Sequence, residues 1–167
     1  MSQNNVLPDE VIAAPIKPKR KSPVIGILIA IAVIALVAIA GYAWYTTSGP
    51  CGTKPVAAAV QSLAEVHDDF DDYYKIASST SRIALTGPVV EMQSIKKETL
   101  ALVVPTCLDH ARSLLVDSMT ADIDGFLFFM TEESDELIIS KMETAADLRQ
   151  DFYAEIARVK KCTPFCK

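Results

Sequence analysis

An uncharged apolar run near the start of the chain constrains its fold more than any other feature. From Val24 to Tyr45 the sequence holds 22 residues without a charged or strongly polar side chain. A helix of this length, at ~1.5 Å per residue, spans ~33 Å and covers the ~30 Å hydrocarbon core of a bilayer. Tyr42 and Trp44 stand at its far end, where amphipathic aromatic side chains favour the lipid headgroup level. The run therefore predicts a single transmembrane signal-anchor helix over residues 23–47.

The charges that flank this run set its expected orientation. Residues 1–22 are polar and interrupted by prolines, and they end in four basic residues, Lys17, Lys19, Arg20 and Lys21. Only Lys54 follows the run closely, and the positive-inside rule keeps the more basic flank in the cytoplasm. We therefore expect a disordered cytoplasmic tail at residues 1–22, a single-pass location in the cell membrane, and an extracytoplasmic domain at residues 48–167.

Two kinds of processing compete with an uncleaved anchor. A cleaved signal peptide has an apolar core of ~7–15 residues, which is shorter than this run, although the triplet Ala38-Ile39-Ala40 offers a cleavage site. A lipid anchor on Cys51 is disfavoured, because Ser48-Gly49-Pro50 does not form the run of small apolar residues that precedes such a site. An uncleaved anchor fits the length of the run better than either alternative.

The entry to the apolar run also carries a short resemblance. The stretch KRKSPVIG passes from basic to apolar residues and resembles the start of archaeal type IV prepilins. This resemblance covers about eight residues and implies a pilin-like processed envelope subunit. A stop-transfer helix with basic flanks has the same pattern.

The remainder of the chain, residues 51–167, is long enough for one domain with a hydrophobic core and too short for two. The whole chain carries a net charge of −5, and because residues 1–22 contribute +2, the remainder carries −7. An acidic domain repels the phosphate backbone of nucleic acids. We therefore expect no nucleic-acid partner.

Apolar residues recur at helical spacing through nearly all of this domain, and the alternating pattern typical of strands is absent. The expected helices cover residues 54–81, 88–104, 105–130 and 135–161, and Pro105 separates the second from the third. Short connections favour antiparallel neighbours, so the sequence predicts an all-α, up-down-up-down four-helix bundle. The core positions predicted for the first helix are Val56, Val60, Leu63, His67, Phe70, Tyr74 and Ala77. Those predicted for the last helix are Ile138, Met142, Ala145, Leu148, Phe152, Ile156 and Val159.

Four cysteines fall at the expected ends of these helices. If the third and fourth helices form a hairpin, Cys107 and Cys162 lie equidistant from its turn and therefore at the same height. Cys51 precedes the first helix and Cys166 follows the last, at the same end of the bundle. An even number of cysteines in a small exported domain is typical of disulfides. We therefore expect the bridges Cys107–Cys162 and Cys51–Cys166.

The same cysteines admit two other interpretations. A tetrathiolate zinc site would use Cys51, Cys107, Cys162 and Cys166. Structural zinc sites usually have two close pairs, whereas here only Cys162 and Cys166 are close. A redox loop formed by that pair lacks the two-residue spacing and helix N-terminus that lower a thiol pKa. Disulfides are favoured, and zinc remains the alternative cofactor.

The stretch EVHDDFDDYYK, residues 65–75, gathers acidic residues on one expected helix. Asp68 and Asp72 share a face, with Glu65 beside them, and like charges at this spacing repel. The favoured interpretation is a solvated face near Lys75, with Arg149 of the last helix at a similar height. The alternative is a stripe that binds a cation or a basic partner, made of Glu65, Asp68, Asp69 and Asp72.

No nucleophile–base pair or phosphate-binding loop stands out in the sequence, and His67 and His110 fall on opposite halves of the bundle. The sequence therefore predicts a protein that is not an enzyme. We expect an interaction, scaffold or accessory subunit of the cell envelope, in contact with the lipid bilayer and with a protein partner or a second copy. An extracytoplasmic sensor for a small ligand or metal cation is the alternative.

Overall fold

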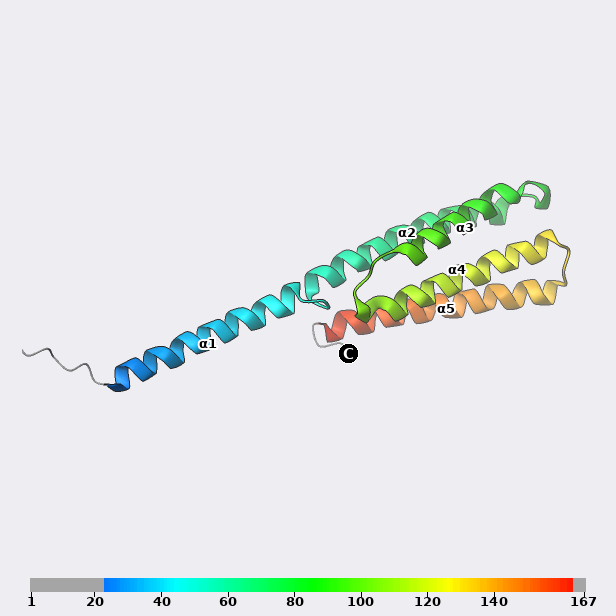
Figure 1. The fold of residues 1–167 in the computed structure, drawn as a ribbon. Coiled ribbons are helices and arrows are strands. Elements are labelled where there is room, and N and C mark those ends of the chain that lie inside the picture. The colour runs from blue at the N-terminus through cyan, green and yellow to red at the C-terminus, as the bar shows by residue number, and fades with distance from the viewer. Residues whose placement is uncertain (1–22, 164–167) are drawn as a thin grey trace, which may run out of the picture. The chain divides into compact units, whose positions relative to one another are not determined.

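The computed structural model describes residues 23–163, and side chains from residue 27 onward. The predicted cytoplasmic tail and Cys166 lie outside the described residues. All regular structure in the described part is helical (Figure 1). In chain order the elements are α1 (Pro23–Ser48), α2 (Thr53–Ser79), the 3₁₀ turn η1 (Arg82–Ala84), α3 (Thr86–Ala101), the 3₁₀ turn η2 (Thr106–Leu108), α4 (Asp109–Met130) and α5 (Asp135–Cys162).

Helix α1 is long and apolar enough to cross a membrane. The described residues fall into two compact units that divide within this helix, after Ala38. The first unit contains the N-terminal part of α1, where every side chain from Ile27 to Ala38 is exposed. Apolar side chains cover the whole circumference of this exposed helix, so it has no polar face for water to solvate.

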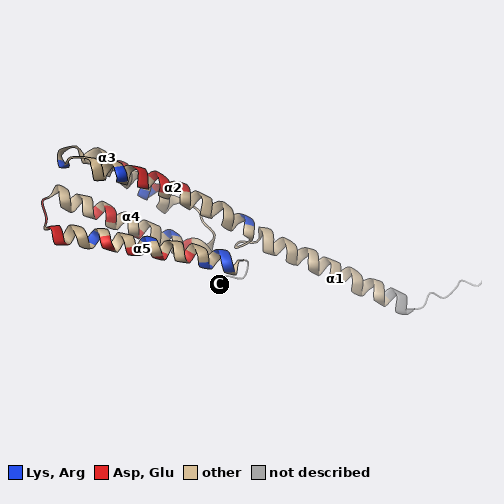
Figure 2. Cartoon of the chain, turned by 180° about the vertical axis from the view of Figure 1, so that it is seen from behind, with Lys and Arg blue, Asp and Glu red and all other residues tan. Residues whose placement is uncertain are grey.

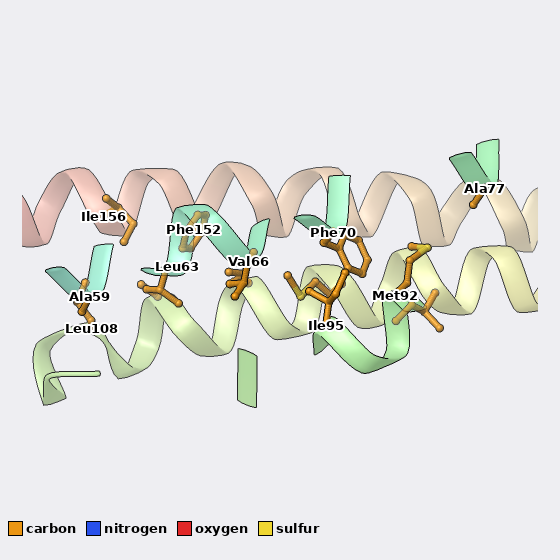
Figure 3. Packing of buried hydrophobic residues seen from close by; sticks show 14 of the residues in the cluster. Ala59, Leu63, Val66, Phe70, Ala77, Met92, Ile95, Leu108, Phe152 and Ile156 are labelled. Carbon is orange, nitrogen blue, oxygen red and sulfur yellow. The ribbon is translucent and has the colours of Figure 1, made fainter. Parts of the chain in front are cut away.

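The second unit contains a hydrophobic core to which α2, α3, α4 and α5 all contribute. On α2, the helical spacing correctly predicts the buried side chains of Val56, Leu63, Phe70 and Ala77. Figure 3 shows Leu63 and Phe70 of α2 in the layer that also holds Phe152 of α5. Because α2 packs against α3 as well, its buried face is wider than one row and also includes Ala59 and Val66.

The proline break predicted in the middle of the domain is present. Helix α3 ends at Ala101, and the chain reaches η2 through four residues that are not helical. Val103 falls within the helix expected over residues 88–104, but it is 96% exposed because it lies in this connection rather than on α3. At the end of α4, Phe129 is 43% exposed. Its neighbour Phe128 is half-buried and lies under Lys141 of α5.

The predicted disulfide pairing is wrong. Cys51 is bonded to Cys107, with 6.2 Å between their Cα atoms, so neither the Cys107–Cys162 nor the Cys51–Cys166 bridge forms. The prediction used only the position of each cysteine along the bundle axis. Several cysteines lie at the same end of the bundle, so this position alone does not choose between their possible pairings. The lateral arrangement of the helices decides the pairing, because it brings the start of α2 beside the segment before α4. Cys162 is also disulfide-bonded.

The helices pack against one another unequally. Helix α5 lies along α4 over most of its length, and α2 packs along α3 (Figure 1). In contrast, α2 and α5 meet at few positions. Helices α2 and α5 therefore share only a narrow contact.

Candidate interaction site between α2 and α5

A hollow of about 160 Å³ lies on the border between α2 and α5. We call the groove that contains it the seam. Most of its surface is apolar, because alanine, valine and aromatic side chains form its walls. The residues that line the seam are Val60, Ala64, His67, Asp68, Phe152, Tyr153, Ile156 and Lys160.

The seam stays open because the two helices present side chains of unequal size there. Helix α2 contributes Ala64, whose side chain is a single methyl group and is exposed. Phe152 and Ile156 of α5 are buried and form the floor, whereas Tyr153 beside them is 54% exposed. An exposed tyrosine next to an apolar floor is a common arrangement at protein interfaces.

His67 fills the centre of the seam as an aromatic side chain. Its ring stacks on Phe152 at 6.3 Å between centroids and meets the edge of Tyr153 at 5.7 Å. Burial lowers the pKa of His67, and the nearby Arg149 guanidinium lowers it further. His67 is therefore a packed histidine that is neutral near pH 7, as the apolar spacing of α2 predicts.

The acidic residues of α2 lie beside the seam. Asp68 borders it and is 85% exposed, with its Oδ1 3.9 Å from Nδ1 of His67. Lys75 Nζ lies 2.8 Å from Asp71 Oδ2 and 3.3 Å from Asp72 Oδ1. The side chains of Glu65, Asp68, Asp69 and Asp72 are all exposed. The structure thus brings these predicted residues together on one solvated face.

The predicted metal ligands are placed as follows. Among the described residues, no three His, Cys, Asp or Glu side chains converge closely enough to hold a metal ion. Cys51 and Cys107 share a disulfide and so do not offer thiolates in this state.

A buried ion pair that the sequence did not predict lies between α4 and α5. The side chain of Asp122 is 1% exposed, and its Oδ2 accepts a hydrogen bond of 3.0 Å from Nη1 of Arg149. Its Oδ1 has no hydrogen-bond partner among the described residues. Burial raises the pKa of Asp122 to about 6, although Arg149 acts in the opposite direction. Arg149 lies near α2 as expected, with its guanidinium 5.7 Å from the centre of the Tyr74 ring, but its ion pair is with Asp122 of α4.

A sequence signal for this contact exists on α4. Ser118, Asp122 and Gly125 are spaced by four and three residues, which places small or polar side chains on one face. All three are buried. At Gly125 an added Cβ would lie 2.8 Å from Cε of Met142 on α5, so the two helices approach closely there.

A second apolar hollow, of about 210 Å³, lies where α2 ends and α5 begins. We call it the terminal hollow. Aromatic and aliphatic side chains dominate its lining. It is lined by Ala77, Ser78, Thr80, Leu85, Phe126, Phe129, Ile138 and Met142.

No protein-family model, curated protein or solved structure matches this chain. The functional argument therefore depends on the sequence pattern and on the geometry of the seam.

Proposed function

We propose that this chain is a single-pass membrane protein whose helical bundle lies outside the cytoplasm and binds a protein partner. In this role it acts as an interaction, scaffold or accessory subunit of the cell envelope. The observation that carries the proposal is the open seam, where Tyr153 and Ala64 remain exposed beside an apolar floor. Exposed apolar surface of this kind marks binding sites in proteins.

Two features support a membrane location and export. Helix α1 is apolar around its circumference, and the basic residues precede it, which favours a cytoplasmic N-terminus. The Cys51–Cys107 disulfide suits an oxidising compartment, because cytosolic thiols are kept reduced. We further propose that the bundle holds a second disulfide, to which Cys162 contributes.

The proposed bundle has an up-down-up-down topology. Contacts between its helices support this arrangement. On α4 and α5, Asp122 pairs with Arg149 and Asp124 with Lys141, so positions that increase along one helix decrease along the other. Antiparallel neighbours have this property, and the short connection between the two helices favours it.

Cross-linking on intact cells tests the proposed function. A membrane-impermeant lysine cross-linker should reach the lysines of the bundle, such as Lys75 and Lys141, and join the chain to a distinct protein in one adduct of defined mass. Protease added outside the cells should remove the bundle. Protection of the bundle in intact cells, together with modification only after lysis, would contradict the proposed location and role.

The terminal hollow favours a second candidate function, a sensor for a small apolar molecule. Its volume of about 210 Å³ and its lining of Phe126, Phe129 and Met142 suit such a ligand. A ligand that binds the folded state raises its melting temperature. Thermal unfolding in the presence of small apolar compounds, Ca²⁺ or Zn²⁺ tests this function, and an unchanged melting temperature across the panel would count against it.

A further inference from the structure

We propose that the seam binds one amphipathic helix of a partner protein, whose apolar face is flanked by lysine or arginine. This inference depends on the proposed function, that the bundle binds a protein, and it names the site and the chemistry of the partner.

The border between α2 and α5 is open at two consecutive heights, which gives room for a bound helix. One hollow of about 280 Å³ lies near the start of α2, between Val56 and Lys160. The seam hollow follows it along the same border. Beyond it, the Tyr74 hydroxyl of α2 lies 3.8 Å from Sδ of Met142 on α5 and closes the border before the terminal hollow. From Val56 to Asp68 the open part extends ~18 Å at the helical rise, which matches about three turns of a bound helix. Helices bind partners by placing an apolar face into an extended groove of this kind.

Apolar side chains flank this border on the solvent side. On α5, Ile139, Ala146 and Tyr153 recur at intervals of seven residues, and all three are exposed. Ile139 is 55% and Tyr153 is 54% exposed. Residues at this interval share a helix face, so they form a row that a second helix can cover. On the opposite side α2 offers Ala64, whose small side chain permits a close approach.

The charges beside the seam indicate a basic partner. Most of the charged residues of α2 are acidic (Figure 2). Lys75 contacts Asp71 and Asp72, and Lys160 of α5 lines the seam together with Asp68. Glu65 and Asp68 lie nearer the start of α2 than Lys75 and are exposed. Lysine or arginine beside the apolar face of the partner would complement these carboxylates.

The same charges argue against a second copy of this chain as the occupant. A symmetric pair that used the seam would bring the same surface of both copies together, so the acidic face of α2 would meet its own copy. Like charges opposed in this way weaken the association.

Peptide binding to the full chain tests the inference. The chain is placed in phosphatidylcholine nanodiscs, with empty nanodiscs as the blank. The probe is a fluorescein-labelled helix of about 18 residues with Leu and Ala on one face and Lys on its flanks, long enough for five turns. A second probe carries Glu in place of Lys. Fluorescence anisotropy should show binding of the Lys probe, and binding of the Glu probe at least about tenfold weaker.

Two matched variants locate the site. Tyr153→Arg should weaken binding of the Lys probe at least about tenfold, because it places a bulky cation in the seam. Leu100→Arg on α3 introduces the same charge at a side chain that is 55% exposed, against 54% for Tyr153. It should leave binding within about twofold of the unmodified chain, since it lies on another helix. Equal loss in both variants, or equal binding of the two probes, would overturn the inference.

Photo-cross-linking in native membranes separates this inference from the proposed function. With p-benzoylphenylalanine at position 64, an adduct mapped to a basic amphipathic helix of another protein supports both proposals. An adduct to a second copy of this chain overturns the proposed occupant. If a partner adduct forms only at position 100 on α3, the proposed function stands and the seam is the wrong site.

Discussion

The two flanks of α5 differ although they belong to one helix. On the α4 side, the buried Asp122 accepts a hydrogen bond from Arg149, and Gly125 permits close contact with Met142. On the α2 side, the exposed Tyr153 borders a hollow that α2 does not fill.

This difference shows that similar helical spacing can produce a closed or an open interface. Around Asp122 and Gly125 the α4 flank is closed, because Gly125 has no side chain and meets the long side chain of Met142, and because Asp122 pairs with Arg149. Toward the start of α4 a hollow of about 270 Å³ lies between His110 and Arg158. The α2 flank stays open because alanine faces a floor of buried aromatic and aliphatic side chains. Close packing at one flank and open surface at the other suit a bundle that is stable and also able to bind.

Loss of the disulfide should have the largest effect, because this bond joins α2 to the segment before α4. The double variant Cys51→Ser/Cys107→Ser frees a loop of 56 residues. Loop-closure entropy predicts a loss of about 4 kcal/mol in the free energy of unfolding. Urea unfolding without reductant measures it, and hydrogen exchange should rise more in α2 than in α4. A variant as stable as the unmodified chain would contradict the role of this bond.

The buried carboxylate should have the next largest effect, and the effect should depend on pH. Because the pKa of Asp122 is raised to about 6 from an ordinary value of 3.8, its contribution to stability is fully present below pH 3.8. This contribution is lost as the pH rises through 6, and it amounts to about 3 kcal/mol at most.

The variant Asp122→Asn should therefore be more stable than the unmodified chain at pH 7. The two proteins should converge near pH 4, where Asp122 is protonated. Arg149 can still donate a hydrogen bond to the amide oxygen of the asparagine. Urea unfolding between pH 4 and pH 7.5 measures the difference, and parallel profiles would show that Asp122 does not titrate as described.

Substitutions of small residues compare the two flanks directly. Gly125→Leu adds a side chain where Met142 already lies 2.8 Å from the position of a Cβ, and overpacking of this kind costs about 2 kcal/mol. Ala64→Leu is the matched change at the open seam and should alter stability by less than about 0.5 kcal/mol. Thermal unfolding measures both. Equal losses would mean that the seam is closed in solution.

The smallest effect is expected for His67, and its sign is opposite to that of Asp122. Burial holds the pKa of His67 below its ordinary value of 6.5, so the stability it contributes is present above pH 6.5 and is lost as the pH falls. His67→Phe keeps an aromatic ring against Phe152 but has no group that takes up a proton, so it should remove the loss of stability that His67 causes as the pH falls. Measured in the Asp122→Asn background, its melting temperature should change less between pH 7 and pH 5 than that of the parent. Tyr153→Phe is the control, because it changes the same aromatic cluster without removing a group that titrates in this range.

Much of the fold could be predicted because helical periodicity is a local property. The spacing of apolar residues identified buried positions such as Leu63 on α2 and Phe152 on α5, and Pro105 marked the break between α3 and α4. The candidate site was predicted only in part. His67 was recognised as a packed histidine, but neither the seam nor the pairing of Asp122 with Arg149 was foreseen. Both depend on which helices become neighbours, and one helix alone does not carry that information.

By itself, the sequence determined that the chain has one apolar helix followed by amphipathic helices with breaks near residues 80, 105 and 134. These features follow from side-chain composition and from hydrogen bonds between residues four apart along the chain. The tertiary structure alone decided that Cys51 joins Cys107 and that α5 lies along α4 while it leaves a hollow beside α2. Such choices depend on how the volumes and charges of distant side chains fit together, and those interactions exist only once the helices pack.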